Sequence, residues 1–508
     1  MLFALTAAEM RSAEESAVAA GLPLAELMER AGAAVAADAA AGAPAGRIAV
    51  VCGKGNNGGD GWIAARELHA AGRDIRVLAL ASPDELASPA REAAYSAVAI
   101  GVPWSRAASG EEVAAGLEGA ALVVDAVFGF GFHPPAREPY ASVLAAIAAI
   151  DAAILAVDMP SGVDSDTGAV SGPAVHADVT LTFTAPKVGL VAYPGAEHAG
   201  EVRVADIGVP RQAIEGVGRV ELLDEEDFLE LFPLTPPDAN KGSRGRLLVV
   251  AGSRGMTGAA AMASEAALRI GAGYVTLACA DSLVETLAAK LTPVVIRPLP
   301  EEAPGVLDPR AAEEVLRLAE RADAVLVGPG ITTAAGPLAV SHRLVAELAM
   351  PLVVDADALN AFAGDPEPLR SRTSPTVLTP HPGELSRLLG ASIAEIQSDR
   401  LSFGSRLATG RVACVLKGAR TVVTGEGRQS IETAGNQGMA TAGSGDVLGG
   451  ILGALLAKGL APYEAAALGV HLHARAGDLA AVALTEECVT ATDILGRIPD
   501  AVAELLGR

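Results

Sequence analysis

The chain has 508 residues and a formal net charge of −23 at pH 7, which argues against nucleic acid or an anionic membrane as a partner, because both require a basic surface. No apolar run is long enough to cross a membrane, the N-terminus lacks the basic segment of a signal peptide, and the four widely spaced cysteines fit neither a disulfide framework nor a zinc site. We therefore expect a cytoplasmic protein with buried free thiols and room for two or three domains.

Short runs of Val, Ile and Leu alternate with alanine-rich helical stretches, a pattern typical of parallel sheets covered by helices on both faces. In the first half, strands are expected at residues 47–52, 74–80, 121–126, 153–158, 178–184 and 201–206. Helices are expected at residues 7–20, 24–40, 59–71, 88–99, 112–118 and 140–150. This order predicts a doubly wound domain whose ligand lies at the carboxyl ends of the strands.

The regular alternation stops between about residues 209 and 245. Residues 221–230 are acidic and residues 232–237 are rich in proline, so neither segment is expected to continue a sheet. We place a first domain at residues 1–212, a linker at 213–235 and a second domain at 236–508. In the second domain, strands are expected at residues 246–250, 273–279, 323–328, 351–355, 376–379, 411–416 and 421–424, and the final helices at 444–458 and 462–479.

A glycine-rich segment, residues 53–61, directly follows the first strand. Glycines let bare backbone N–H groups approach a ligand, and a helix that starts just beyond adds the positive end of its dipole, so the segment suits an anion. The amides of Asn56 and Asn57 can contact a nicotinamide or ribose edge, or ligate a cation through oxygen. A tight turn without a ligand is the alternative. The spacing differs from the dinucleotide fingerprint, which disfavours a plain dehydrogenase.

Asp125 and Asp158 each end an apolar strand beside a glycine-containing turn. One such aspartate is often only a helix N-cap, but two of them next to Asn57 favour a site in the expected crevice. A potassium-type cation suits several neutral oxygens and one carboxylate, which Asn57, Asp125 and Ser161 can supply.

A second glycine-rich segment, residues 435–446, directly precedes an apolar helix pattern. The backbone of Gly443, Ser444 and Gly445 can stabilise charge on a transferring phosphoryl group, and Asp446 is placed to accept a proton from an attacking hydroxyl. An acidic residue in a first helical turn is the alternative for Asp446. His381, with Glu384 close behind, is expected to contact a substrate, unless it only begins a helix.

The first half resembles NAD(P)H-hydrate epimerase over about residues 5–210, through residues 55–61, 125–129, 158–162 and 182–190. The resemblance implies a Rossmann-like domain in which Asn57, Asp125 and Ser161 hold K⁺. It also implies a catalytic role for Asp158 and a set of residues that bind hydrated NAD(P)H: Asn56, Asn57, Gly58, Gly59, Asp60, Gly129, Phe130, Gly131, Phe132, His133, Pro134, Pro135 and Asp158.

The second half, about residues 240–505, resembles the ribokinase-like fold and within it the ADP-dependent NAD(P)H-hydrate dehydratase. The similarity rests on residues 240–242, 251–253, 328–330, 378–384, 417–421 and 435–446. It implies that Ala260, Gly330, His381 and Asp446 contact the substrate, with Asp446 catalytic. It implies that ADP is held by Lys417, Gly418, Ala419, Arg420, Thr421, Asn436, Gly443, Ser444 and Gly445. Val294 stands where this family is expected to have a glutamate.

Together the two resemblances imply repair of hydrated NADH and NADPH. The first domain would interconvert the R and S epimers with K⁺, and the second would dehydrate the S epimer with ADP and Mg²⁺, giving NAD(P)H, AMP and phosphate. We also expect a homo-oligomer. One alternative is a ribokinase-like small-molecule kinase fused to a nucleotide-binding domain. Another is a nucleotide-sensing scaffold, which would need neither Asp446 nor Lys417.

Overall fold

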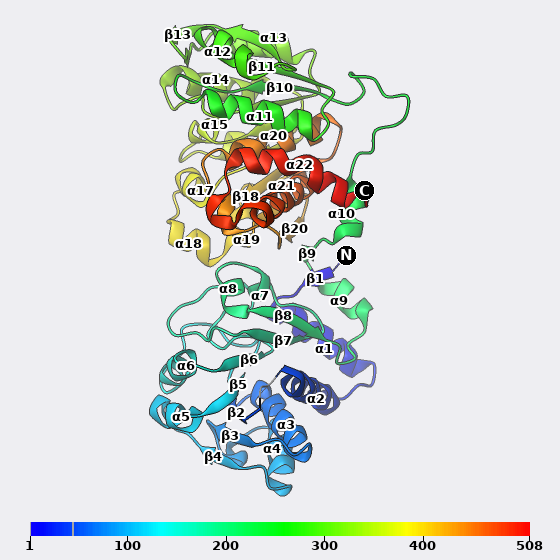
Figure 1. Ribbon diagram of the computed structural model, residues 1–508, viewed down its shortest axis with the longest axis vertical. Coiled ribbons are helices and arrows are strands. Elements are labelled where there is room, and N and C mark those ends of the chain that lie inside the picture. The colour runs from blue at the N-terminus through cyan, green and yellow to red at the C-terminus, as the bar shows by residue number, and fades with distance from the viewer. Residues whose placement is uncertain (1, 43–44) are drawn as a thin grey trace. The chain divides into compact units, whose positions relative to one another are not determined.

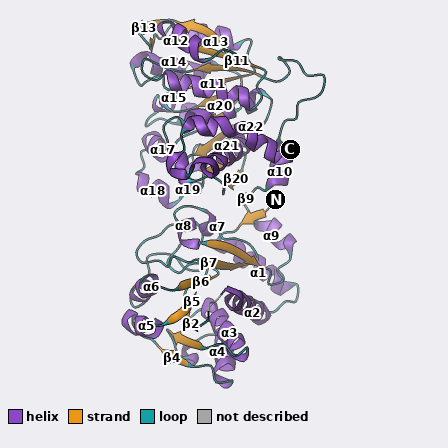
Figure 2. Cartoon of the chain, in the orientation of Figure 1, coloured by secondary structure: helices purple, strands orange, loops and turns teal. Residues whose placement is uncertain are grey.

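The computed structural model describes residues 2–42 and 45–508, which divide into two compact units. The N-terminal unit comprises mainly residues 2–221, and the C-terminal unit mainly residues 222–396 and 400–508. Each unit has strands flanked by helices (Figure 1, Figure 2). Across the described ranges, no helix combines the length and the apolar character that a membrane span requires.

A parallel sheet of seven strands forms the centre of the N-terminal unit. The strands are β2 (Arg47–Cys52), β3 (Ile75–Ala79), β4 (Trp104–Arg106), β5 (Ala120–Ala126), β6 (Ala153–Val157), β7 (Val179–Phe183) and β8 (Glu201–Ala205). Their order is β4-β3-β2-β5-β6-β7-β8, so the direction of winding reverses between β2 and β5. In doubly wound sheets, the carboxyl ends of the strands at such a reversal form the ligand crevice.

Helices cover both faces of this sheet. They are α1 (Ala7–Ala19), α2 (Leu24–Gly42), α3 (Asn56–Ala70), α4 (Ala90–Ala99), α5 (Gly110–Leu117), α6 (Tyr140–Ala148), α7 (Val188–Val191), α8 (Gly195–Ala199) and α9 (Arg211–Val217). Successive residues of β2 point to opposite faces. Ile48 and Val50 pack in one core with α2 and α3, whereas Ala49 and Val51 pack in a second core with α5 and α6. The predicted doubly wound architecture is confirmed.

The sheet of the C-terminal unit contains parallel and antiparallel strands. They are β10 (Arg246–Val250), β11 (Tyr274–Ala280), β12 (Val295–Leu299), β15 (Ala324–Val327), β16 (Leu352–Val354), β17 (Thr376–Leu378), β18 (Val412–Leu416), β19 (Val422–Gly425) and β20 (Arg428–Ile431). Their order in this unit is β20-β19-β18-β17-β16-β15-β10-β11-β12. The strands from β12 to β18 are parallel, but β18, β19 and β20 pair antiparallel. The sheet departs from the predicted parallel arrangement only at this edge, because the short turns there leave no room for a crossover helix.

The helices of the C-terminal unit surround this sheet. They are α10 (Glu225–Leu231), α11 (Thr257–Arg269), α12 (Val284–Lys290), α13 (Ala311–Ala319), α14 (Ala335–Glu347), α15 (Asp357–Asn360), α16 (Glu367–Arg370), α17 (Pro382–Leu389), α18 (Ile393–Ser398), α19 (Arg400–Ser405), α20 (Ser444–Ala457), α21 (Pro462–Leu484) and α22 (Ala491–Leu505). A separate hairpin pairs β13 (Glu301–Ala303) with β14 (Val306–Leu307). Helix α20 packs against α11 and α21 and is buried along most of its length.

The segment between the two units carries regular structure of its own. The units divide at residues 221 and 222, which lie within β9 (Val220–Leu222). Strand β9 lies beside β1 (Leu2–Ala4). The expectation that the acidic run continues no sheet is therefore wrong at its start, because Val220 is buried and directs this short stretch into a strand. The rest of the acidic run forms α10, which begins after the N-cap Asp224.

The first glycine-rich segment is mostly helical, since α3 begins at Asn56 and not near residue 59 as predicted. Its glycines allow close packing. A Cβ atom on Gly58 would lie 2.0 Å from the Gly53 carbonyl oxygen, and one on Gly61 would lie 2.6 Å from Ala126 Cβ. This packing brings the first turn of α3 close to the ends of β2 and β5.

The prediction of buried free thiols is confirmed for three of the four cysteines. Cys52, Cys279 and Cys414 are buried free thiols in or at the end of strands, but Cys488 is exposed. Cys488 lies in a short turn after α21, where no strand carries it into a core.

Candidate active sites

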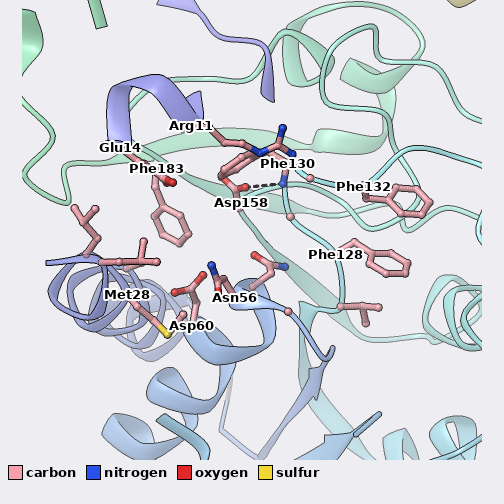
Figure 3. A pocket seen from close by; sticks show the side chains of 18 of the residues that line it. Arg11, Glu14, Met28, Asn56, Asp60, Phe128, Phe130, Phe132, Asp158 and Phe183 are labelled. Atoms are coloured by element: carbon pink, nitrogen blue, oxygen red, sulfur yellow. Dashed lines mark hydrogen bonds between the residues drawn. The ribbon is translucent and has the colours of Figure 1, made fainter. Parts of the chain in front are cut away.

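A cavity of about 480 Å³ opens in the N-terminal unit, at the carboxyl ends of the strands where the winding reverses. It is lined by polar side chains of α1 and α3, by the loop after β5 and by the residue that follows β6 (Figure 3). These residues include Arg11, Glu14, Asn56, Asn57, Asp60, residues 127–133 and Asp158. The position agrees with the crevice that doubly wound sheets use for ligands.

Asp158 and Lys187 form a buried ion pair at one wall of this cavity. Lys187 Nζ lies 2.5 Å from Asp158 Oδ1 and also donates to Thr182 Oγ1 and to the Phe183 carbonyl, each at 3.0 Å. The backbone N–H of Phe130 donates to Asp158 Oδ2 at 3.0 Å, which ties the loop after β5 to the pair. Asp158 has a φ of 66°, a strained conformation that costs a non-glycine residue about 1 to 3 kcal/mol.

Three segments of the N-terminal unit meet at Gly129. A Cβ atom there would lie 3.0 Å from both Asn57 Oδ1 and Asp158 Oδ2, so a larger residue would push at least one of these side chains away from the loop. Asn57 belongs to α3 and Asp158 follows β6. The structure thus brings together the side chains that the sequence assigned to separate strand ends.

Asp125 lies at the end of β5, wholly buried, and its carboxylate is held by Ser161. The Ser161 backbone N–H and hydroxyl donate to it at 2.8 and 2.7 Å, and the Val127 N–H donates at 3.2 Å. Burial raises the pKa of Asp125 to about 6, although these hydrogen bonds oppose the shift.

Two further carboxyl groups face the cavity, Glu14 from α1 and Asp60 from α3. Burial raises the pKa of Glu14 to about 7, with the charge of Asp158 adding to the shift and Lys187 opposing it. Burial also raises the pKa of Asp60 well above its ordinary value, and Asp158 and Glu14 add to this shift. Both carboxyls therefore take up protons more readily than a carboxyl in water.

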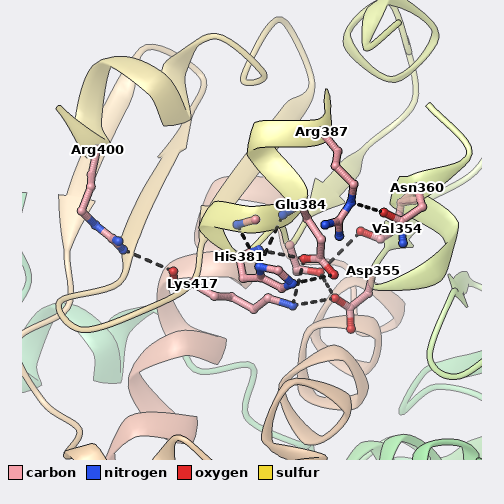
Figure 4. A network of polar contacts seen from close by, with 10 residues as sticks. Val354, Asp355, Asn360, His381, Glu384, Arg387, Arg400 and Lys417 are labelled. Carbon is pink, nitrogen blue, oxygen red and sulfur yellow. Dashed lines mark hydrogen bonds and ion pairs between the residues drawn. The ribbon is translucent and has the colours of Figure 1, made fainter. Parts of the chain in front are cut away.

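In the C-terminal unit, three neighbouring strands, β16, β17 and β18, are followed by Asp355, Thr379 and Lys417 (Figure 4). Lys417 Nζ lies 2.9 Å from Asp355 Oδ1 and 3.8 Å from Glu384 Oε2, and the Thr379 hydroxyl donates to Asp355 at 2.5 Å. Burial disfavours the ammonium, but the two carboxylates outweigh it and raise the pKa of Lys417. Buried Arg400 donates to the Lys417 carbonyl at 3.4 Å and so holds the end of β18.

His381 is the N-cap of α17. Its Nδ1 accepts hydrogen bonds from the backbone N–H groups of Gly383 and Glu384 at 3.0 and 3.3 Å, and Glu384 accepts from the His381 N–H at 2.8 Å. Since Nδ1 is an acceptor, the neutral ring carries its proton on Nε2, which lies 3.4 Å from Glu384 Oε1. Burial lowers the pKa of His381, which favours this neutral form.

Asp446 lies in the first turn of α20, one residue after Gly445. The N-cap Gly443 has a φ of 95°, a conformation that suits glycine and turns the chain into the helix. Burial raises the pKa of Asp446 to about 7, the charge of Asp355 adds to the shift, and Lys417 opposes it. The result is a carboxyl at the start of a helix that exchanges its proton near neutral pH.

Two family models match the chain. One, described as YjeF-related protein N-terminus, matches residues 24–189, and the other, described as NAD(P)H-hydrate dehydratase, matches residues 247–500. A relative from Thermofilum pendens, named bifunctional NAD(P)H-hydrate repair enzyme, is 42% identical over 491 residues, which cover 94% of this chain and 92% of the relative. A relative of the same name from Moorella thermoacetica is 41% identical over 460 residues, covering 89% of this chain and 87% of the relative.

The chain belongs to the family of bifunctional NAD(P)H-hydrate repair enzymes. A solved structure of an ADP/ATP-dependent NAD(P)H-hydrate dehydratase from Bacillus subtilis, co-crystallised with ATP and Mg²⁺, is also similar. It is 24% identical and has a TM-score of 0.47, over 56% of this chain and 99% of that one.

The residues that family resemblance assigns to the first site do not all face the cavity. Asn56, Asn57, Asp60, residues 129–133 and Asp158 line it. Gly58 and Gly59 instead pack inside the unit, and a Cβ atom on Gly59 would lie 2.7 Å from Met28 Sδ. The remaining assigned residues lie outside the lining: Asp125, Pro134, Pro135 and Ser161.

The residues assigned to the second site cluster in part. A Cβ atom on Gly445 would lie 3.5 Å from Lys417 Nζ, so the start of α20 faces the end of β18. Other assigned side chains are engaged with the protein: Thr421 donates to the Gly418 carbonyl, and Arg420 donates to the Thr433 carbonyl. Five further assigned positions lie as follows: Ala260 is fully buried, Ala419 is exposed between β18 and β19, Asn436 donates to Asp478, Ser444 contacts His473, and Gly330 has a φ of 62°. Val294, the departure from the family pattern, is buried.

The charged residues of these sites that sequence reasoning missed include Arg11, Glu14, Lys187, Asp355 and Arg400. Asp355 had a signal, since it ends an apolar strand just as Asp125 and Asp158 do. Glu14 and Arg400 had none, because each lies on a helix that carries no glycine motif.

Proposed function

We propose that the N-terminal unit interconverts the R and S epimers of hydrated NADH and NADPH, and that the C-terminal unit dehydrates the S epimer with ADP. Family membership over nearly the whole chain carries this proposal. The sites support it, because each unit places a carboxyl with a pKa of about 7 beside a Lys–Asp pair. Assembly into a homo-oligomer stays a prediction.

A K⁺ site in the N-terminal unit fits Asn57, Asp125 and Ser161. Asn57 Nδ2 is buried and has no hydrogen-bond partner among the described residues, as expected where an amide end faces a group that is not protein. Amide nitrogen and oxygen exchange places by rotation, so this end can offer oxygen to a cation. K⁺ would supply a positive charge that favours the ionised form of Asp125, against the effect of burial. Within the described ranges, no group of three or more His, Cys, Asp and Glu side chains forms a metal site.

In the C-terminal unit, Asp446 would take the proton of the S epimer's hydroxyl, whose oxygen then attacks the β-phosphorus of ADP. The bond from that phosphorus to the bridging oxygen breaks, and AMP leaves. The backbone N–H groups at the start of α20 and the ammonium of Lys417 would stabilise the charge on the transferring phosphoryl group. Mg²⁺ would accompany ADP, and the carboxylates of Asp355 and Glu384 beside Lys417 are oxygen donors of the kind that it prefers.

The phosphate ester then loses phosphate together with the electron pair of its C–O bond, while the lone pair of the ring nitrogen forms a C=N bond. Loss of a proton from the neighbouring ring carbon restores the double bond of NAD(P)H. The net products are NAD(P)H, AMP and phosphate, and no phosphorylated product accumulates.

The test is to incubate the full chain with racemic hydrated NADH, ADP and Mg²⁺. Complete conversion to NADH with one AMP and one phosphate per turnover is expected. Conversion that stops when the S epimer is consumed would exclude the epimerase, and a stable phosphorylated product would favour the kinase alternative. Omitting K⁺ should slow only the conversion of the R epimer.

A further inference from the structure

One carboxylate of the cavity in the N-terminal unit, that of Asp158, is engaged with protein groups on both of its oxygens. The Lys187 ammonium has three N–H donors, and its three oxygen partners belong to Asp158, Thr182 and Phe183. Asp158 also accepts the Phe130 N–H. With an ammonium on one oxygen and a backbone donor on the other, the Asp158 carboxylate is held in place by protein groups, an arrangement that suits a positioning residue.

Glu14 and Asp60 differ from Asp158 in this respect. Neither carboxyl makes a hydrogen bond or ion pair with any residue in the part of the chain that the structure describes, yet both line the cavity (Figure 3). Asp60 is only 8% exposed. Glu14 is half-buried. A carboxyl that lines a cavity without a protein partner is available to a ligand. The two side chains come from different elements, α1 and α3.

We propose that Glu14 and Asp60 are the acid–base pair of the epimerisation, and that Asp158 is a positioning residue that fixes Lys187 and the loop after β5. The inference rests on the proposed epimerase function of this unit. It names a residue, Glu14, in a helix that carries no recognisable motif, and it gives Glu14 and Asp60 the catalytic role that the resemblance implied for Asp158.

The chemistry needs two groups. Protonated Asp60 gives its proton to the hydroxyl on the hydrated carbon, and the C–O bond breaks with its electron pair on oxygen, which leaves as water. The ring nitrogen's lone pair forms a C=N bond. Water then adds to the opposite face, the π pair returns to nitrogen, and ionised Glu14 takes the proton that this water sheds. The hydroxyl is inverted, one proton has moved from Asp60 to Glu14, and the reverse reaction starts from this second form.

The electrostatics suit a pair that shares one proton. The titratable or charged groups that line the cavity with Glu14 are Arg11, Lys54, Asp60, His133 and Asp158, with Lys187 paired to Asp158. Burial raises the cost of ionising both carboxyls, and the charge of Glu14 adds to that cost for Asp60. The singly protonated pair is the active form in both directions, so the rate should be bell-shaped in pH, with its acid limb near pH 7.

The experiment measures inversion of the R epimer by the full chain without ADP, which keeps the dehydratase idle. Glu14→Gln should lower kcat by at least about 100-fold, as expected for loss of an acid–base group. It should also remove the acid limb of the pH profile, which a purely structural role would leave in place. The matched control is Glu15→Gln, the same change at an exposed neighbour on α1, which should leave rate and profile unchanged. In isotopically labelled water, each inversion by the wild-type chain should place one solvent oxygen in the product.

A fall of less than tenfold for Glu14→Gln, an unaltered acid limb, or inversion without uptake of solvent oxygen would overturn the proposal. Should Glu14→Gln fail to fold by circular dichroism, Glu14→Asp decides, since it keeps the carboxyl and should retain the acid limb with a reduced kcat. Absence of inversion in the wild-type chain would instead refute the epimerase function itself. The two failures are therefore distinguishable.

Discussion

The N-terminal and C-terminal sites share one arrangement of charged side chains, although the two units have different folds. Each places a carboxyl with a pKa of about 7 beside a Lys–Asp pair: Glu14 beside Lys187 and Asp158, and Asp446 beside Lys417 and Asp355. In both, burial and a neighbouring carboxylate raise the pKa of the free carboxyl, and the lysine limits the rise. A proton-transfer group near neutrality thus results from a balance of opposing effects and not from one contact.

The two sites differ in the exposure and the hydrogen-bond partners of their lysines. The Lys187 side chain is 1% exposed and all three of its donors have protein acceptors, so its charge serves the fold. The Lys417 side chain is 19% exposed, and its Nζ hydrogen-bonds to Asp355 while Glu384 lies farther away. We infer that the first lysine fixes the site and the second presents charge to a phosphate.

The largest expected effect is the loss of dehydration rate when Asp446 is substituted. Asp446→Asn keeps the size and the start of α20 but cannot accept a proton, so ADP-dependent dehydration should fall by about 10² to 10⁴, or roughly 3 to 5 kcal/mol of barrier. In the wild type, the base must be ionised, so the rate should fall as the pH drops below about 7. Rates across pH, with calorimetry of ADP binding, check both statements.

The same chain supplies the control for Asp446→Asn. Epimerisation belongs to the other unit and should be unchanged, and ADP affinity should stay within a few-fold. A loss of dehydration below tenfold would reduce Asp446 to an acidic residue of a first helical turn.

Replacing each lysine by methionine tests whether Lys187 serves mainly the fold and Lys417 mainly ligand binding. Lys187→Met leaves Asp158 buried without its partner, and breaking such a pair costs about 3 to 5 kcal/mol. Lys417→Met should destabilise its unit less, because the Lys417 side chain is 19% exposed whereas that of Lys187 is 1% exposed, but should weaken ADP binding at least tenfold. Thermal unfolding and calorimetry on both variants measure this. Equal losses of stability would contradict the contrast between a structural and a functional lysine.

The sequence was most informative where the pattern was regular. Strands such as residues 47–52 and 246–250 were predicted with their observed bounds, because buried parallel strands read as apolar runs. The short strands at Trp104 and at residues 428–431 were missed, since neither is an apolar run, and the strand predicted at 421–424 was not expected to run antiparallel. Glu14 was missed for a physical reason: its role depends on burial and on neighbours from α3 and β6, which only the fold brings together.

The third prediction concerns the boundary between the units. Phe228 of α10 is buried and stacks on His471 of α21, with ring centroids 3.8 Å apart. A fragment that begins at Asp224 should therefore be more stable than one that begins at Pro233, by about 2 kcal/mol for the lost apolar burial. Urea unfolding of the two fragments gives the difference. Equal midpoints would show that α10 does not belong to the folded C-terminal unit.

The smallest expected effect separates two roles of His381. Its Nδ1 caps α17 while Nε2 is left for a carboxylate or a substrate. His381→Ala removes the cap and should lower the free energy of unfolding by about 1 kcal/mol, whereas His381→Asn offers a cap oxygen and should keep most of it. Both variants lose the ring N–H, so both should raise the KM for the S epimer by about tenfold, the worth of one hydrogen bond. If Asn restores the KM together with the stability, then His381 only begins a helix. If His381→Asn restores the stability but not the KM, then the ring contacts the substrate. His381 then both caps α17 and binds substrate, whereas in the N-terminal site Asp158 holds the structure and Glu14 transfers the proton.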